Sequence, residues 1–542
     1  MLKRTSTLAP LRHANFRTLW TANMISNLGG IIQGIGAGWL MTTITDSKSM
    51  VALVQAAATL PIMLFSLPAG ALADNFDRRT IMIVAQSLMM AASVALAVFT
   101  YQGWLTPVSL LLLTFAIDSG TALNNPSWQA SLGDVVPRED VPSAVTLNSV
   151  GFNLMRSIGP AIGGIIVAAA GAAAAFVVNA ASYVALIVAL VRWKPPVAAG
   201  RLPRESFGSA VAAGLRYTAM SPNLVAVLFR GALFGLAAVS ILALMPVIAA
   251  GPLGGSAFTY GTLLGCFGIG AIAGGSLNGR VRERLSNEAI VRWACVGFAA
   301  SCVALAFSRQ IWLSHLLLMP AGACWVLSFS LFNVTVQLST PRWVVGRALA
   351  LYQTATFGGM AAGSWLWGEI AEVWGVDMAL TGSALALVLA ALAGMRYRLP
   401  EFSDLNLDPA DEFREPRLRL DLKARSGPVM IMVDFTIAQE DVPAFLGAMT
   451  DRRRIRLRDG ARQWVLLRDL ENPEIWTESY HVPTWVEYLR HHQRRTQADS
   501  EVSQRLLKLH RGPEAPRVHR MIERQTVPLR DDMPLKPDPE IR

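Results

Sequence analysis

Apolar runs of roughly twenty residues recur between Trp20 and Tyr397, and short polar or charged connections separate them. Hydrophobic positions are continuous within each run instead of alternating with polar ones, which predicts helices and not strands. A helix of this length crosses a hydrocarbon core of about 30 Å and satisfies its own backbone hydrogen bonds there. The pattern predicts twelve transmembrane helices, in two sets of six, over residues 17–44, 50–73, 79–100, 105–132, 143–169, 173–193, 222–250, 256–280, 288–308, 311–337, 346–372 and 376–397.

Two polar stretches divide the chain further. One separates the two sets and contains an amphipathic stretch over Phe207–Ala219, and after Pro400 the composition becomes that of a soluble domain. We therefore expect an all-α membrane protein with a small cytoplasmic α+β domain. The expected segments are a first six-helix half (1–193), a cytoplasmic connection (194–221), a second six-helix half (222–398), a linker (399–427), the α+β domain (428–525) and a tail without fixed structure (526–542).

The two predicted halves repeat each other. Residues 136–152 align without gaps on residues 340–356, and the same register places Gly159, Gly164 and Gly171 on Gly363, Gly368 and Gly375. Two related halves are typical of transporters that rock around a central site.

Charge in the connections predicts the orientation of the chain. Lysines and arginines gather in the connections of one side, whereas the other side carries only Lys48 and Arg309. By the positive-inside rule both termini lie in the cytoplasm, in a multi-pass protein of the cell inner membrane. The net charge of +10 is then a topology signal plus a basic tail, so we expect no nucleic-acid partner. The basic N-terminus has no cleavage site after it, and the first run is interpreted as a span instead of a signal peptide.

Cofactor chemistry finds no support in the sequence. All four cysteines lie within apolar runs, without the spacing of a metal site or a disulfide framework. The chain also lacks a phosphate-binding loop for ATP. We expect no cofactor, no metal and no ATP-driven transport.

The connection after the second predicted helix reads GALADNFDRR and carries Gly70, Asp74, Arg78 and Arg79. It resembles the signature of the major facilitator superfamily at this position, with departures at residues 75 and 77. The resemblance implies the two-half facilitator fold and a gating role in which Asp74 meets a helix N-terminus or an arginine of the other half. The alternative is that the two arginines only keep this loop in the cytoplasm.

The fifth predicted helix contains Gly159-Pro160-x-x-Gly163-Gly164. This pattern resembles the glycine-proline motif of facilitator antiporters, although Met155 stands where that motif has another glycine. The resemblance favours antiport, and tight helix packing is the alternative explanation. Residues 115–164, in the fourth and fifth predicted helices, resemble more specifically the transmembrane secretion effector subgroup, which contains the bacterial enterobactin exporter, and the resemblance covers roughly Leu11 to Arg398.

Ionisable side chains at membrane depth are costly and mark functional candidates. Asp118 and Arg156 lie midway in the fourth and fifth predicted helices, and Glu369 lies late in the eleventh. A carboxyl group whose proton affinity changes as an arginine approaches is a simple proton carrier, so we name these three residues as coupling candidates. A permanent ion pair is the alternative for Asp118, and Glu369 at its helix end can simply face water. Arg230 is expected to snorkel to the cytoplasmic surface.

Amide side chains within the apolar runs are candidates for a polar substrate cavity, although some of them must bond helix to helix instead. The candidates are Asn27, Gln33, Asn124, Gln129, Asn333 and Gln337.

The tail predicts a strand over 428–437, a helix over 440–456, strands over 462–470 and 475–482, one helix over 484–510 and a last strand over 517–525. This order resembles a ferredoxin-like domain and is similar to the dimeric α/β-barrel group that includes cofactor-free monooxygenases. An enzymatic tail would use aromatic and histidine side chains, namely His481, Trp464, Trp485, Tyr480, His491 and His492. The alternative is a regulatory module, or a dimerising one through which the chain self-associates.

These features predict a secondary active transporter, a proton-coupled exporter of a small organic molecule such as a siderophore, a drug-like compound or a secondary metabolite. Its partners are that molecule, protons and the lipid bilayer. A transporter fused to a monooxygenase-like domain and a membrane sensor that transports nothing stay open as alternatives.

Overall fold

The chain forms two compact units in the computed structural model, which describes residues 8–137, 139–194, 207–401, 406–408, 410, 415–416, 418–423 and 425–523. The helical unit comprises residues 1–207, 223–336 and 349–401, and the mixed unit comprises residues 208–222, 337–348 and 402–542. Part of the predicted linker (402–405, 409, 411–414, 417 and 424) and all of the predicted tail after residue 525 lie outside the described residues. The segment boundaries drawn from the sequence therefore remain predictions.

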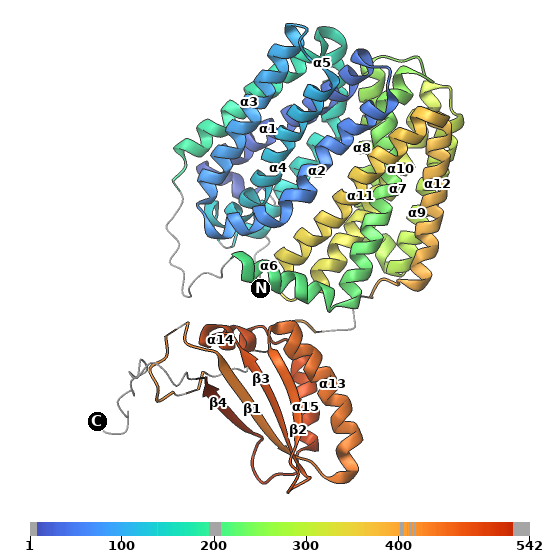
Figure 1. Cartoon of the computed structure of the whole chain (residues 1–542). Coiled ribbons are helices and arrows are strands. Elements are labelled where there is room, and N and C mark those ends of the chain that lie inside the picture. Colours follow the sequence, from blue (N-terminus) through green and yellow to red (C-terminus); the bar gives the residue numbers. More distant parts are fainter. Residues whose placement is uncertain are drawn as a thin grey trace. The chain divides into compact units, whose positions relative to one another are not determined.

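Long helices build the helical unit (Figure 1). After a short 3₁₀ turn at Ala9–Arg12 they are α1 (Ala14–Ile44), α2 (Lys48–Asn75), α3 (Arg78–Tyr101), α4 (Pro107–Val135), α5 (Val141–Arg192), α7 (Pro222–Ala250), α8 (Ala257–Arg284), α9 (Asn287–Phe307), α10 (Ile311–Leu338), α11 (Val345–Trp374) and α12 (Val376–Arg396). Within the described residues, nine helices are long and apolar enough to cross a membrane, and they are α2, α3, α4, α5, α7, α8, α9, α10 and α12.

A glycine divides the longest helix in two. α5 runs for 52 residues, but Gly171 inside it has φ 78° and ψ 172°, far from helical values. A positive φ is accessible to glycine at little cost, so the chain can change direction there. This break falls between the fifth and sixth helices that the hydrophobic pattern predicts.

Missing side chains let α5 approach two neighbours. A Cβ added at Gly163 would lie 3.2 Å from the Ile32 Cα of α1, and one at Gly164 would lie 3.0 Å from the Gly261 Cα of α8. Gly159 also faces α1, where its Cβ would meet the side chain of Ile31. The glycines of the fifth-helix motif thus serve two close helix crossings, as small residues commonly do in membrane bundles.

Arg230 does not reach water, so the expectation that it snorkels is wrong. Its side chain is 1% exposed, and its Nη1 donates to both carboxylate oxygens of Glu288, at 3.1 and 3.2 Å. The same nitrogen donates to the backbone oxygen of Tyr397. A carboxylate in the first turn of α9 therefore neutralises this guanidinium inside the protein, which removes the need to reach the surface.

The mixed unit contains a four-stranded antiparallel sheet with helices. Its strands are β1 (Val429–Thr436), β2 (Arg462–Arg468), β3 (Ile475–Val482) and β4 (Arg517–Ile522), in the order β2-β3-β1-β4. Its helices are α6 (Phe207–Ala219), α13 (Val442–Asp459), α14 (Trp485–Gln493) and α15 (Gln497–Leu509), with a 3₁₀ turn at Gln439–Asp441. These strands match those predicted from the tail.

One predicted helix of the tail is two helices. α14 ends at Gln493 and α15 begins at Gln497, where Thr496 and Asp499 form a reciprocal capping box. The Asp499 carboxylate accepts a hydrogen bond from the Thr496 backbone nitrogen at 3.0 Å. Such a box satisfies backbone donors at a helix start, so it favours a new helix over continuation of the old one.

A buried carboxylate lies at the centre of the mixed unit. Glu478 is 0% exposed, and it accepts hydrogen bonds from Arg452 Nε at 2.8 Å, Arg456 Nε at 3.2 Å and Trp464 Nε1 at 3.0 Å. Burial raises the pKa of Glu478, but the two arginines outweigh burial and lower it to about 2. The cluster is stable only as a whole, because removal of one partner leaves a buried charge uncompensated.

Two segments distant in sequence pack on the tail domain within the mixed unit. The ring of Tyr217 in α6 lies 5.1 Å from the Arg458 guanidinium and meets the ring of Trp343 edge-on at 5.6 Å. Arg494 in turn lies 4.5 Å above Trp343. Arg216 adds a hydrogen bond of 3.2 Å to the Arg458 backbone oxygen. Two adjoining aromatic rings between two guanidinium groups therefore join α6 and the connection between α10 and α11 to this domain.

Replacing the buried carboxylate tests the cluster. We expect Glu478→Gln to destabilise the mixed unit by about 3–5 kcal/mol, because Arg452 and Arg456 then lose their counter-charge. Hydrogen exchange of the full chain should accelerate in peptides that cover β1 and β3. The control Glu471→Gln changes an exposed turn between β2 and β3. Equal exchange in both variants would contradict a structural role for the cluster.

The same carboxylate predicts a dependence of stability on pH. Its pKa is lower in the folded chain than in the unfolded chain, so its contribution is present above about pH 4.5 and is lost as the pH falls toward 2. Exchange protection of β3 should therefore decline between about pH 5 and about pH 3. Glu478→Gln should flatten this decline, and an unchanged slope would assign the acid sensitivity to other groups.

Candidate functional site

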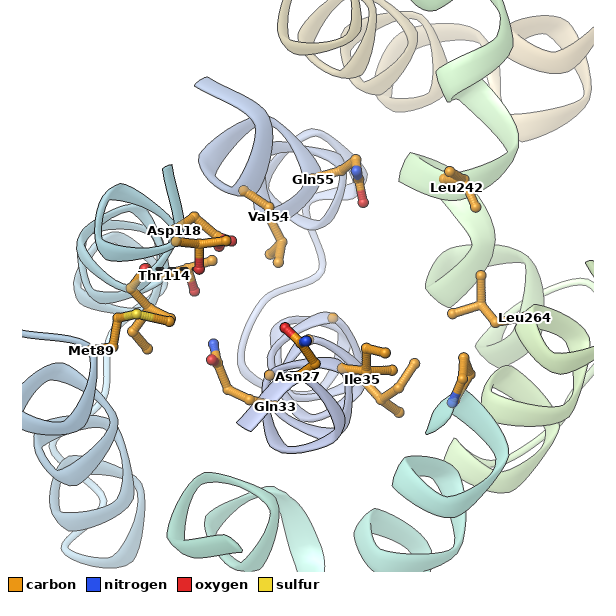
Figure 2. Close-up of a pocket in the computed structure, with 18 of the residues that line it drawn as sticks. Asn27, Gln33, Ile35, Val54, Gln55, Met89, Thr114, Asp118, Leu242 and Leu264 are labelled. Carbon is orange, nitrogen blue, oxygen red and sulfur yellow. Dashed lines mark hydrogen bonds between the residues drawn. The ribbon is translucent and has the colours of Figure 1, made fainter. Parts of the chain in front are cut away.

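A central cavity lies among seven helices of the helical unit. It has a volume of about 360 Å³ and is lined by residues of α1, α2, α3, α4, α5, α7 and α8. Figure 2 shows the side chains of Asn27, Gln33, Gln55, Thr114 and Asp118 around this space.

Asp118 brings a carboxylate to the wall of the cavity. It lies near the middle of α4, a helix that begins with a capping box between Thr106 and Ser109. Asp118 and Thr114 are one helical turn apart and both line the cavity (Figure 2). Among the described residues, the Asp118 carboxylate forms no hydrogen bond or ion pair. An ionisable group at membrane depth without a partner is available to a proton or a ligand.

A buried polar network supports the wall beside Asp118. The Asn179 side-chain nitrogen lies 2.9 Å from Gln33 Oε1, 3.0 Å from Ser93 Oγ and 3.1 Å from the Tyr183 hydroxyl. Gln33 and Tyr183 both line the cavity. The network fixes these two side chains, because each has its partner within the helix bundle.

The wall across from Asp118 is apolar. Leu242 of α7 and Leu264 of α8 lie on the opposite side of the cavity from Asp118 (Figure 2). Ala243 and Pro246 of α7 continue this surface. The cavity thus joins a polar wall from the first half of the chain to an apolar wall from the second half.

The predicted cavity amides fall into two groups. Asn27, Gln33 and Asn124 line the cavity, whereas Gln129, Asn333 and Gln337 are not among its lining residues. Sequence reasoning missed Gln55, Gln86, Tyr183 and Tyr260, which also line it. The two glutamines carried the same signal as the named amides, an amide within an apolar run, but no sequence pattern distinguishes the two tyrosines.

Arg156 is not among the residues that line the cavity, but it lies on the face of α5 that borders the cavity. It is one helical turn after Phe152 and one before Pro160, both of which line the cavity, so the three residues share a face. Its side chain is exposed, and no hydrogen bond or ion pair joins it to Asp118 or to any other described residue. The structure therefore places both charges near the cavity without pairing them.

Glu369 belongs to a contact between α11 and the start of α2. Its carboxylate accepts a hydrogen bond of 2.6 Å from Ser49 Oγ. One turn later, Glu372 accepts from the backbone nitrogens of Lys48 at 2.6 Å and Ser49 at 3.3 Å. A carboxylate at a helix N-terminus satisfies free backbone donors and the positive end of the helix dipole. The two halves thus meet at this end of the helical unit.

Comparison with known proteins gives the family. Residues 5–526 match the family described as transmembrane secretion effector. The match covers nearly the whole chain and extends through β4. The chain belongs to this family. It is a multi-pass membrane protein and a major facilitator transporter, not an enzyme, and it is related to siderophore and drug exporters.

The chain is similar to several transporters. The enterobactin exporter EntS of Salmonella typhi is 24% identical over 399 residues, which cover 72% of this chain and 95% of EntS. The multidrug efflux pump Tap of Mycobacterium bovis is 23% identical over 73% of this chain and 96% of Tap. The staphyloferrin A transporter of Staphylococcus aureus is 31% identical over 166 residues, which span 30% of this chain and only 42% of that relative.

Solved structures share the fold. The chain superposes on a bacterial homologue of the human lysosomal transporter Spinster in its inward-facing, occupied conformation. The TM-score is 0.59, and the match covers 72% of this chain and 97% of that chain. For the POT family transporter PepTSo the TM-score is 0.60, over 71% and 97% of the two chains. Sequence identity is 12% in both cases, so the likeness shows the fold alone.

The two arginines that follow α2 make contacts within the first half of the chain. Arg78 donates to Asp134 Oδ2 at 2.8 Å, and Arg79 donates to the backbone oxygens of Leu190 at 2.8 Å and Val191 at 2.6 Å. Arg79 thereby satisfies carbonyl groups at the C-terminal end of α5. Gly70 has open space where a Cβ would lie, and the Asp74 side chain lies outside the described part of the structure.

The candidate residues of the enzymatic alternative mostly pack inside the mixed unit. Tyr480 lies under Arg456, whose Nη1 also contacts His491 Nε2 at 2.9 Å. Burial, and then the charge of Arg456, hold the pKa of His491 well below its ordinary value, so its ring is neutral. Trp485 stacks on Tyr488. No group of three or more His, Cys, Asp or Glu among the described residues is placed to hold a metal ion.

Removing the helix cap tests the contact between α2 and α11. We expect Glu372→Ala to accelerate hydrogen exchange several-fold in peptides over residues 47–55, because the backbone donors of Lys48 and Ser49 lose a cap of about 1 kcal/mol. The control Asp377→Ala removes an exposed ion pair with Arg309 instead. Unchanged exchange over residues 47–55 would show that Glu372 does not hold this end together.

Proposed function

We propose that this chain is a proton-coupled exporter of a small organic molecule, which works by alternating access around the central cavity. The observation that carries the proposal is the unpaired carboxylate of Asp118 in the cavity wall. The family and the named relatives support an export function, and the carboxylate supplies a site for the coupling ion.

Twelve spans fit the observed helices. The nine apolar helices give ten crossings if α5 crosses once on each side of Gly171, and α1 and α11 add the remaining two. With an even number of spans the termini share one side, and loop charge favours the cytoplasm of a cell inner membrane for both. Two six-helix halves, residues 1–193 and 222–398, are proposed on this count, and the other four segments are proposed from the composition of the sequence.

Coupling at Asp118 follows from the cost of a charge in a low dielectric. A neutral, protonated carboxyl group is the less costly form when the cavity is closed from water, and the ionised form is stable when water enters. Binding a proton on one side of the membrane and losing it on the other would bias the rocking of the two halves. Arg156 would favour proton loss whenever it approaches Asp118, and Glu369 remains a second coupling candidate.

The gate and the motif glycines have separate roles in this proposal. Asp74 would contact the other half in one state only, while Arg78 and Arg79 keep the first half rigid and the loop cytoplasmic. The close crossing at Gly164 lets α5 and α8 move without bulky side chains between them. The glycine-proline motif and its position support antiport.

The substrate classes come from the relatives and from the cavity. A siderophore, a drug-like compound or a secondary metabolite would fit the amides and the apolar wall. Three of the six candidate side chains in the tail are buried and the other three are half-buried, which favours a regulatory or self-associating domain over a monooxygenase. A membrane sensor without transport is the remaining alternative.

Metabolite profiles test the export function and its coupling residue together. We expect one compound to build up in the cytoplasm of a deletion strain and to leave it in the complemented strain. Asp118→Asn should reduce export about a hundredfold or to background, because its side chain cannot exchange a proton. Cells are grown with and without iron limitation, and compounds are measured in medium and cytoplasm.

The control for this experiment is Asp377→Asn, which removes an exposed carboxylate that pairs with Arg309 outside the cavity. This variant should export normally. Coincident profiles in all strains would overturn the exporter proposal, and full export by Asp118→Asn would overturn only the coupling role.

A further inference from the structure

We propose that the central cavity takes an amphoteric small molecule, whose basic nitrogen binds Asp118 and whose acidic group binds Arg156. The inference rests on the proposed function for the role of the cavity, and it adds the charge pattern of the substrate. It depends on three observations: the direction of Arg156, the absence of partners for both charges, and the apolar surface beside them.

The neighbours of α5 fix the direction of Arg156. Gly159 and Gly163 face α1, while Ser157 and Gly164 face α8. At 100° per residue, residue 156 falls between these two directions. Ile158 is an exposed apolar residue on the opposite side of the helix. Arg156 therefore points into the space between α1 and α8, where the cavity lies.

The depth of Arg156 matches the middle of the bundle. A Cβ added at Gly268, halfway along α8, would lie 3.3 Å from the Arg156 backbone oxygen. A guanidinium group keeps its charge at every physiological pH. A permanent charge at this depth is costly unless an anion neutralises it, and among the described residues no carboxylate lies within ion-pair distance.

The two charges stay apart from each other. Asp118 and Arg156 lie on different helices and form no ion pair, so neither neutralises the other. A molecule with a basic and an acidic group can neutralise both charges at once. Guanidinium binds carboxylates and similar oxyanions through two parallel hydrogen bonds, whereas a carboxylate binds an ammonium group through a single charge-assisted bond.

The remaining surface suits an apolar body between those two groups. Phe152, Leu242 and Leu264 line the cavity without a charge, and the Tyr260 ring lines it too. Such a lining favours an aromatic or aliphatic scaffold. The charge pattern also explains why proton and substrate would move in opposite directions, because a proton and the basic group of the substrate compete for the same Asp118 carboxylate.

Four fluorescent probes on one scaffold test the charge pattern. Nα-dansyl-lysine carries an amine and a carboxylate, its methyl ester carries only the amine, Nα-dansyl-norleucine carries only the carboxylate, and the norleucine methyl ester carries neither charge. We expect the purified full chain to bind dansyl-lysine roughly tenfold more tightly than either singly charged probe, since each charge-assisted hydrogen bond strengthens binding by about that factor.

Two variants should each lose one part of this binding preference, either the part due to the amine or the part due to the carboxylate. Asp118→Asn should remove the gain from the amine and keep the gain from the carboxylate, and Arg156→Gln should do the reverse. Arg156→Lys should keep part of the carboxylate preference, which shows that a folded cavity is present. The matched controls Asp377→Asn and Arg309→Gln alter an ion pair exposed at 47% and 52% and should leave all four affinities unchanged.

The outcomes separate this inference from the proposed function. Equal binding of the four probes, or an Arg156→Gln variant that keeps the carboxylate preference, would overturn the inference while export of a neutral or cationic compound stands. A charge preference without proton-coupled export would support the inference and overturn the proposed function.

Discussion

The close approach of α5 to α8 depends on two positions that have no side chain. Gly164 and Gly261 face each other so closely that a Cβ on either one would meet backbone atoms of the other helix. Lipid offers no hydrophobic force between helices, so backbone contact and dispersion at this crossing join the two halves, together with the hydrogen bonds between α2 and α11. The same crossing places Arg156 beside the cavity, because the residues that face α1 and those that face α8 leave it only the direction between them.

Charged side chains inside the protein are the second constraint, and they occur either with or without a counter-charge. Arg230 and Glu478 lie inside the protein with their counter-charges at hydrogen-bond distance, and both clusters are structural. Asp118 and Arg156 keep their charges free beside a cavity. The contrast separates charges that stabilise the fold from charges that are available to a ligand or a proton.

Local signals explain what the sequence could predict. The length and continuity of the apolar runs predict the helices and the break near Gly171, because the thickness of a membrane fixes the length of each apolar helix. The residues of the capping box at Thr496 are present in the sequence, but the helical pattern on both sides of them predicts one continuous helix and not the end of α14. Contacts between distant segments were not predictable: Glu288 lies 58 residues from Arg230. Asn27, Gln33 and Asn124 line the cavity, but Gln129 and Asn333 do not, because an amide in an apolar run shows polarity without direction.

The rings and guanidinium groups that join α6 to the tail domain impose an order on synthesis. α6 ends at Ala219, whereas α13, which carries Arg458, begins only at Val442. At roughly 5–20 residues per second, the ribosome needs on the order of ten to forty seconds to make the intervening chain. Throughout that interval Tyr217 has no Arg458 beside it, Trp343 is made only about halfway through, and α7 to α12 are being synthesised. Assembly of the mixed unit is therefore a late event in biogenesis, because it requires translation through β4 (Arg517–Ile522).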